Sequence, residues 1–324
     1  SIVCPLWRST SSKTTVVVVK TREAIGRQTF EQLAARAETL AAADRAAEEA
    51  RAVPTRVERA LVDERPRLLG LAYRITGSRI DAEDVVQEAW ERARRAGVDE
   101  VDRPSAWLTT VVSRLALDRL RAAQRRRENY VGPWLPEPVV AVDEPTGPGA
   151  DPAHLVEMAE SLTFGFLRVL ESLTPIERAV FVMADVFGVP FGEIAAAVDR
   201  SSDACRQVAS RARRRVRDQH RTGAATEGAG PVADALVVAL MAGDADRVLS
   251  LLAPDVVLVS DGGAEVRAAR RPVVGPERVG RLLLNLARRT VELGVRYERR
   301  TYNGQEGAVA LWGDVTAFVT AVTV

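Results

Sequence analysis

Residues 191–217 read FGEIAAAVDRSSDACRQVASRARRRVR, which is the pattern of a helix-turn-helix. An apolar helix over 191–198 is followed by a short turn and by a second helix that begins with serines and is rich in arginine. We expect the second helix to enter the major groove of DNA. The side chains expected at base edges or phosphates are Ser201, Ser202, Asp203, Arg206, Gln207, Ser210, Arg211, Arg213, Arg214, Arg215 and Arg217. The alternative is a helical block that only packs.

A second basic helix is predicted upstream, over residues 104–127. Seven arginines and a single acid lie between Arg103 and Arg127, and arginines on one helix can neutralise phosphates or fork onto bases. The alternative is a solvated helix face, since 43 of the 45 basic residues of this chain are arginines. The candidate DNA-contacting residues here are Trp107, Arg114, Asp118, Arg119, Arg121, Arg125, Arg126 and Arg127.

Length and composition describe a folded chain of several domains. The chain has 324 residues, of which 47% are hydrophobic and 27% charged, so two or three globular domains are expected. No apolar run approaches the roughly 20 residues of a membrane span. With only Cys4, Cys205, His154 and His220, we expect no disulfide framework, no metal site, no cofactor and a cytoplasmic location.

Hydrophobic periodicity and linkers divide the chain into two all-α domains followed by an α+β domain. Helices are expected over 57–73, 78–95, 104–127, 155–173, 176–187, 191–198, 201–219, 232–241 and 279–287, and strands over 256–260, 266–269, 295–302 and 309–324. Six prolines lie between residues 132 and 152 and mark an extended connector. The expected boundaries are 1–55, an unassigned extension; 56–128, a first helical domain; 129–153, a linker; 154–221, a second helical domain; 222–230, a linker; and 231–324, the α+β domain.

Several motifs in this order resemble a known family. The runs Tyr73-Arg-Ile-Thr-Gly, Asp81-Ala-Glu-Asp-Val-Val-Gln-Glu-Ala-Trp and Leu173-Thr-Pro-Ile-Glu-Arg-Ala-Val-Phe, with the segment 107–121, resemble extracytoplasmic-function sigma factors of RNA polymerase. The run Tyr130-Val-Gly-Pro-Trp-Leu-Pro-Glu-Pro and the last domain are similar to the sigma-J group of actinobacteria. The resemblance covers residues 56–324 and implies an alternative sigma factor that directs promoter-specific initiation.

The resemblance also assigns roles to the helices. The acidic helix would dock on core RNA polymerase through Asp81, Glu83, Asp84, Gln87 and Glu88. On physical grounds alone, the same acids could simply favour a helix N-terminus. The 104–127 helix would recognise the minus-ten promoter element, and the 201–217 helix the minus-thirty-five element. Arg114 stands where the wider family often has asparagine, so only a phosphate contact is expected from it.

The last domain resembles the SnoaL-like, nuclear-transport-factor-like fold, a cone of curved sheet and helices that regulates the attached sigma domains in cis. We therefore expect intramolecular docking and no separate anti-sigma factor. The residues expected to mediate it are Trp134, Leu135, Pro136, Glu137, Pro138, Asp261, Gly262 and Gly263. The family's Asp-Gly-Gly-Gly-Lys appears here as Asp261-Gly-Gly-Ala-Glu, which reverses the last charge, and its Asn-Gly turn as Asn303-Gly-Gln.

Two hypotheses from other functional classes remain. A conventional helix-turn-helix regulator with a ligand-binding domain would share the 191–217 pattern but would not need the acidic docking helix or a second basic helix. A SnoaL-type enzyme would use Asp255, Asp261 or Glu265 as general acid or base. The last third contains no histidine, and an enzyme would not act on polymerase in a promoter-dependent assay.

Overall fold

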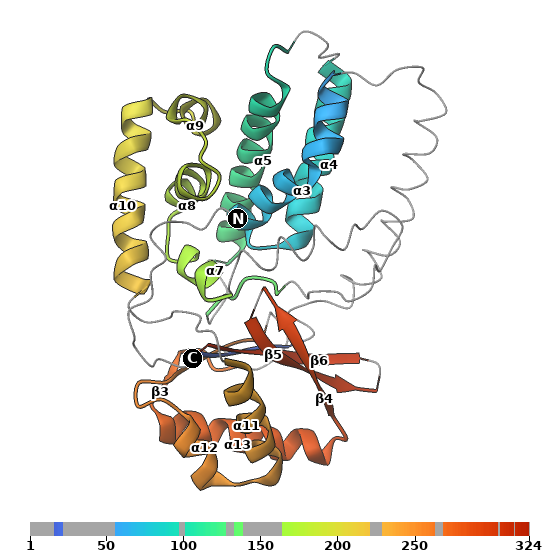
Figure 1. Cartoon of the computed structure of the whole chain (residues 1–324), viewed down its shortest axis with the longest axis vertical. Helices are drawn as coiled ribbons and strands as arrows, with labels where there is room; N and C mark the ends of the chain where they lie inside the picture. The colour runs from blue at the N-terminus through green and yellow to red at the C-terminus, as the bar shows by residue number, and fades with distance from the viewer. Residues whose placement is uncertain are drawn as a thin grey trace.

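In the computed structural model, a helical body lies above a sheet-and-helix domain (Figure 1). The structure describes residues 16–21, 56–96, 101–127, 133–138, 164–220, 229–262, 268–303, 305–313 and 315–323. No helix within these ranges is long and apolar enough to cross a bilayer. The expected fold class, two helical domains followed by an α+β domain, is confirmed.

The first helical domain contains α3 (Arg56–Thr76), α4 (Arg79–Ala96) and α5 (Pro104–Arg127). The three predicted helices are confirmed to within a few residues. Their apolar positions recur every three to four residues and form the interior of the bundle. Gly77 ends α3 with a φ of +76°, a conformation that glycine adopts without steric cost.

The second helical domain contains α7 (Phe164–Leu170), α8 (Pro175–Phe181), the π-helix η1 (Val182–Val186), α9 (Phe191–Val198) and α10 (Ser202–His220). Thr174 caps α8 in a capping box with Glu177. The helix predicted over 176–187 ends as an α-helix at Phe181 and continues as η1. Residues 155–163 of the predicted helix 155–173 lie outside the described residues.

The α+β domain contains α11 (Ala229–Ala242), α12 (Ala245–Leu251), β2 (Val257–Asp261), β3 (Val273–Val274), α13 (Pro276–Glu292), β4 (Arg296–Tyr302), β5 (Gln305–Trp312) and β6 (Val315–Thr323). Two predictions were wrong here, and helix α12 was missed. The strand expected over 266–269 is absent from its described part, 268–269, and the short strand is β3. The single strand expected over 309–324 is a hairpin, because Gly313 turns the chain at a φ of +62°.

The sheet contains a strand from the opposite end of the chain. Its order is β3-β2-β1-β6-β5-β4, where β1 is Val16–Thr21. Strand β1 pairs in parallel with β2 and antiparallel with β6. Sequence reasoning assigned no element to this segment, because a run of valines alone does not identify its pairing partner.

The two faces of this sheet have different neighbours. Leu258 of β2 and Ala310 of β5 pack with the helices α11–α13 in one apolar cluster. Val259, the next residue of β2, packs instead with Leu135 of the interdomain linker. Because successive side chains of a strand point to opposite faces, the helices cover one face and the linker lies on the other.

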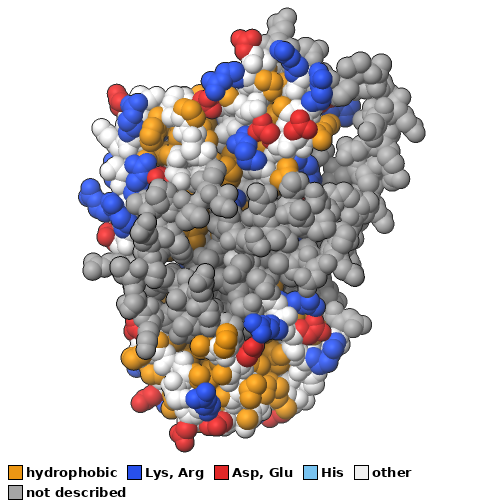
Figure 2. All heavy atoms as spheres, in the orientation of Figure 1, with side chains coloured by type: hydrophobic (Ala, Val, Ile, Leu, Met, Phe, Trp, Pro, Cys, Tyr) orange, Lys and Arg blue, Asp and Glu red, His pale blue; other side chains and the backbone are white. Residues whose placement is uncertain are grey.

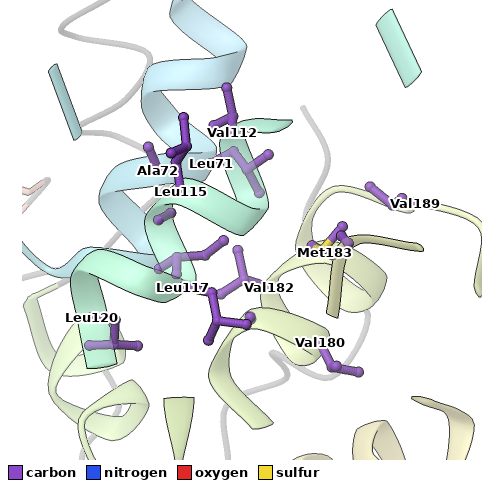
Figure 3. Close-up of a cluster of buried hydrophobic side chains, with 14 of the residues drawn as sticks. Leu71, Ala72, Val112, Leu115, Leu117, Leu120, Val180, Val182, Met183 and Val189 are labelled. Atoms are coloured by element: carbon purple, nitrogen blue, oxygen red, sulfur yellow. The ribbon is translucent and has the colours of Figure 1, made fainter. Parts of the chain in front are cut away.

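The two helical domains share one hydrophobic core (Figure 3). Leu117 of α5 lies beside Val182 of η1 in this cluster, and Leu120 of α5 and Leu71 of α3 belong to it as well. Side chains from 57 to 216 form a continuous set of contacts. The first two domains are therefore packed together by apolar burial, the main stabilising term in folding.

Candidate nucleic-acid and polymerase interface

The recognition helix α10 presents a polar face to solvent. The exposed residues that were predicted to contact DNA are Ser201, just before the helix, and Asp203, Arg206, Gln207, Ser210, Arg211, Arg214, Arg215 and Arg217 within it. Figure 2 shows Lys and Arg side chains along the left edge of the upper half, where α10 lies in Figure 1. The opposite face of α10 carries Val208, Ala212 and Val216 into the core. This division leaves one basic face of α10 available for a phosphate backbone.

The turn between α9 and α10 has the geometry that the helix-turn-helix requires. Asp199 ends α9 in the left-handed region, with a φ of 54°, and the Arg200 amide donates to the Ala195 carbonyl at 3.1 Å. The Ala204 amide donates to the Ser201 hydroxyl at 3.2 Å, so Ser201 caps the start of α10.

Some of the predicted reading residues have structural contacts. Ser202 donates to the Phe191 carbonyl at 3.4 Å, which joins α10 to the start of α9. Arg213 is half-buried and pairs with Asp185 of η1 at 2.7 Å. Arg206 pairs with Asp203 and lies over the Phe191 ring, 5.5 Å from its centroid, yet remains exposed. Packing accounts for Ser202 and Arg213 without DNA.

The basic helix α5 contacts the helix-turn-helix directly. The Arg114 guanidinium donates to the Ala196 carbonyl of α9 through Nη2 at 2.6 Å and Nε at 3.1 Å. Arg103, just before α5, pairs with Glu193 of α9 at 2.8 Å. A cation is favourable at the carbonyl end of a helix. In this arrangement Arg114, a predicted minus-ten contact, is held by the second helical domain.

The predicted polymerase-docking acids lie beside a predicted DNA-binding arginine. Arg119 of α5 lies 3.4 Å from Asp84, 3.9 Å from Asp81 and 4.0 Å from Glu88 of α4. Glu83 pairs with Arg79 at 2.9 Å, and Gln87 is half-buried. These partly exposed pairs contribute little to stability individually. The acidic face of α4 therefore lies against Arg119 in this arrangement.

The remaining α5 residues differ in exposure. Arg125 is exposed, and Asp118 is exposed and pairs with Arg121 at 3.3 Å. Trp107 is half-buried and packs against the helical core, as expected for a structural residue. The backbone of α5 continues to Arg127, but the side chains of Arg126 and Arg127 lie outside the described residues.

Three parts of the chain meet at the Tyr73 hydroxyl, at the end of α3. The hydroxyl donates to the Glu137 carbonyl of the linker at 2.6 Å and accepts from Asn303 Nδ2, in the β4–β5 turn, at 3.0 Å. Tyr73 and Asn303 are both buried. Burial raises the pKa of Tyr73 far above its usual value, so the phenol stays protonated and can donate.

The linker segment 133–138 is held on both sides. Glu137 accepts from the Arg79 amide at 3.0 Å and from the Ser78 hydroxyl at 3.1 Å, and its own amide donates to the Gly77 carbonyl at 2.9 Å. The Leu135 amide donates to Asp261 Oδ2 at 2.9 Å, and the Leu135 side chain is fully buried. Pro136 is also buried, while Trp134 and Pro138 are half-buried. Gly262 is buried beside Asp261, and Gly263 lies outside the described residues.

A buried arginine joins the two helical domains beside this point. Arg178 of α8 is 1% exposed; its Nε donates to the Arg74 carbonyl at 2.9 Å, and Nη1 pairs with Glu171 at 2.5 Å. Arg74 is itself buried and lies over the Phe187 ring, 5.2 Å from its centroid. Burial lowers the pKa of Arg74 to about 10. Gly77 leaves room for this contact, because a Cβ there would lie 3.0 Å from Arg178 Nη2 and from Glu171 Oε1.

The similarities of the chain to known proteins agree with this geometry. Residues 61–126 match the sigma-70 region 2 model, and residues 164–216 the sigma-70 region 4 model. Over 227 residues the chain is 46% identical to the ECF RNA polymerase sigma factor SigJ of Mycobacterium tuberculosis, covering 69% of this chain and 71% of that protein. The chain belongs to the extracytoplasmic-function sigma factors. It is an alternative sigma factor that directs transcription initiation, as its motifs predicted.

Further relatives support the same assignment. This sigma factor is 37% identical over 224 residues to the probable ECF RNA polymerase sigma factor SigI of M. tuberculosis, covering 68% of this chain and 73% of that protein. The crystal structure of M. tuberculosis SigJ superposes with a TM-score of 0.60 at 42% identity, covering 78% of this chain and 82% of that one. Sigma factors bind core RNA polymerase and promoter DNA, and these relatives are sigma factors rather than enzymes.

One expectation about partners finds no support. Among the solved structures that match is the sigma factor RpoE of Bartonella quintana in complex with the anti-sigma factor NepR, at 19% identity and a TM-score of 0.38. That similarity is too low to say anything of this chain. The expected absence of a separate anti-sigma factor is not supported by the comparisons, and we do not propose it.

Sequence reasoning missed two residues of this sigma factor that connect its parts. Tyr73 and Arg178 both lie in quoted motifs, but neither was assigned a role. A buried tyrosine or arginine carries no periodic signal that distinguishes contact within a domain from contact between domains. The position of Gly77 directly after a long helix was the available signal, since glycine allows another backbone or side chain to approach closely.

Proposed function

We propose that the C-terminal domain of this sigma factor regulates promoter recognition in cis by stabilising a closed arrangement of regions 2 and 4. The observation that supports this proposal is the position of the Tyr73 hydroxyl, which contacts the linker at Glu137 and the C-terminal domain at Asn303. A change at either contact would leave a buried polar group without its partner. Such a loss costs about 1–3 kcal/mol, enough to shift a two-state equilibrium severalfold or more.

The closed arrangement does not suit simultaneous reading of both promoter elements. The minus-ten and minus-thirty-five elements lie roughly 25 base pairs apart by name, about 85 Å along straight DNA at about 3.4 Å per base pair. The proposed minus-ten helix α5 hydrogen-bonds to α9 of the helix-turn-helix through Arg114. Regions 2 and 4 must therefore separate before both helices can contact their elements.

The linker gives the C-terminal domain a means of opposing this separation. Leu135 is bound to Asp261, and Glu137 to the start of α4. These two contacts hold the C-terminal domain, which follows region 4 in the chain, against region 2 and so limit how far region 4 can move away. Release of Leu135 and Asn303 would free the linker and favour the open form.

Within the open form, we propose three contact surfaces. The acidic face of α4, from Asp81 to Glu88, would bind core polymerase. The α5 arginines would contact the minus-ten element once Arg114 leaves Ala196. The exposed face of α10, centred on Arg206, Gln207 and Arg211, would contact the minus-thirty-five element.

The proposal is tested by run-off transcription with purified core RNA polymerase, using the full chain and its Leu135→Ala variant. Leu135 lies outside the proposed DNA and polymerase surfaces, so the variant should yield more promoter-dependent transcript at limiting concentration. Leu283→Ala is the matched control, because it shortens a buried leucine of α13 that packs inside the C-terminal domain. Equal transcript from Leu135→Ala and the unaltered chain, with both folded, would contradict regulation through the linker.

A further inference from the structure

Strand β1 occupies the middle of the C-terminal sheet although it comes from the start of the chain. Residues 16–20 pair in register with residues 257–261 of β2, and residues 16–21 pair with residues 318–323 of β6. The family models begin at residue 61, so they assign no role to this strand. Its position is independent of the regulatory proposal, because it rests on strand pairing alone.

Strand β1 is the only connection between two parts of the sheet in the described residues. On one side lie β2 and β3, and on the other the antiparallel meander β4-β5-β6. Without β1, the facing edges of β2 and β6 would each lose a row of backbone partners. Unpaired strand edges within a sheet are unfavourable and bind other strands readily.

The sequence of β1 suits such a position. Four consecutive valines occupy 16–19, and β-branched residues favour strands. An uninterrupted apolar run is typical of an interior strand with a parallel neighbour, in contrast to the alternation of a half-exposed strand. Lys20 and Thr21 follow, and the register places Lys20 opposite Asp261.

We propose that the interval between β2 and β6 is a strand-binding site for an extended, valine-rich segment, and that residues 16–21 are its releasable occupant. Binding by strand addition depends mainly on backbone hydrogen bonds, so a separate peptide of the same sequence can replace the native strand. Release of β1 would also remove the neighbour of Val259 and Asp261, the β2 residues that contact Leu135. Occupancy of this site is therefore coupled to linker docking.

The occupant also changes how the C-terminal domain is attached. The chain enters the domain after α10 of region 4 and reaches α3 of region 2 after β1. With β1 hydrogen-bonded in the sheet, the chain tethers the domain to region 2 through β1 as well as to region 4. With β1 released, the only remaining chain tether of the domain leads to region 4, so strand occupancy controls one of its connections to region 2.

Hydrogen exchange on the full chain tests the proposal without polymerase or promoter. The amides of residues 16–21 should exchange slowly, like those of β5. A Val18→Pro variant should exchange at least about tenfold faster over 257–261 and 315–323, because proline removes a ladder donor from an interior strand, while α8 and α10 remain unchanged. Ser12→Pro, four residues before the strand, is the control. Exchange of 16–21 at the unstructured rate in the unaltered chain would overturn the proposal.

Binding in trans tests the site itself. A labelled peptide of residues 13–22 should bind a chain lacking residues 1–22 with one-to-one stoichiometry and restore protection over 257–261. The same peptide N-methylated at Val17 and Val18 should bind at least about tenfold more weakly, because adjacent amides point to opposite neighbours and both ladders lose a bond. Equal binding of the two peptides would overturn the proposal. If the shortened chain fails to fold, the hydrogen-exchange comparison of Val18→Pro with Ser12→Pro tests the proposal instead.

Discussion

The Tyr73 hydroxyl and the Asn303 side-chain amide lie 3.0 Å apart, although 230 positions separate the two residues in sequence. Asn303 is fully buried and adopts a left-handed backbone with a φ of 50°, which asparagine tolerates better than most residues. The turn after β4 therefore directs this amide at region 2. Because Tyr73 also contacts Glu137, a single oxygen atom connects region 2, the linker and the C-terminal domain.

Replacing Tyr73 by Phe should weaken the closed arrangement while keeping the aromatic ring. The change removes one oxygen and leaves the Asn303 amide and the Glu137 carbonyl without this partner, at a cost of about 1–3 kcal/mol in unfolding free energy. Denaturant unfolding of the full chain measures this loss. Run-off transcription should increase in parallel, because the open form gains population.

The matched control is Tyr297→Phe. The Tyr297 hydroxyl also bonds to a buried partner, Thr290 at 2.8 Å, but both residues belong to the C-terminal domain. This variant should lose comparable stability without a rise in transcript. A similar rise from both variants would show that general destabilisation, rather than the interdomain bond, controls activity.

Gly77→Ala should loosen the contact between regions 2 and 4. Alanine pays roughly 1–2 kcal/mol in a left-handed conformation, and its Cβ would also displace the Arg178–Glu171 pair. The combined loss in unfolding free energy should exceed that of Gly188→Ala. Gly188 has a φ of +62° but open space around the added Cβ, so it isolates the backbone cost. Equal losses of unfolding free energy in the two variants would show that the Arg178 side chain moves aside at no cost.

Arg211 and Arg213 should separate DNA binding from packing. Arg211→Ala removes an exposed cation of α10 and should weaken binding of the holoenzyme to a promoter fragment. The plot of the logarithm of the binding constant against the logarithm of the salt concentration should become less steep by about 0.9. Arg213→Ala breaks the partly buried pair with Asp185 and should lower the unfolding free energy with little change in that slope. An unchanged footprint of Arg211→Ala over the minus-thirty-five element would show that Arg211 does not contact it.

The stability of the chain at alkaline pH should depend on the ionisation of the Tyr73 phenol. Because its pKa in the folded chain is raised, the unfolded state releases the proton first, and Tyr73 lowers stability as pH rises above about 10. Arg74, whose folded pKa is lowered to about 10, acts with the opposite sign over the same range. The free energy of unfolding, measured with urea between pH 9 and 11, should therefore fall less steeply with pH for Tyr73→Phe than for the unaltered chain, by up to about 1.4 kcal/mol per pH unit. The same pH dependence of the unfolding free energy in both proteins would show that Tyr73 is not the group that ionises.

Local patterns identified most of the helices. The period of apolar residues predicted α3, α4, α5 and α9 to within three residues at each end, and the capping box of Thr174 fixes the start of α8. These features depend on short-range interactions, including capping and one-sided burial. The hairpin at Gly313 and helix α12 were missed, because one glycine or one short helix is a weak signal.

The exposed face of α10 could also be predicted, since a charged stripe on an amphipathic helix points to solvent. The functions of Ser202, Arg114 and Arg119 could not be separated from those of their neighbours in this way. Each of them contacts a residue of another element, the Phe191 carbonyl, the Ala196 carbonyl and the Asp84 carboxylate respectively. Such pairings depend on the packing of distant segments.

The sequence by itself determined the family, the two helical regions, the helix-turn-helix and the α+β character of the last domain, because each rests on periodicity or on a motif within a short window. Only the tertiary structure decided that the two regions share one core, that Tyr73 meets Asn303, and that strand β1 completes the distant sheet. Burial and strand pairing act between surfaces that are brought together by folding. Their partners are set by three-dimensional complementarity, which a local pattern does not encode.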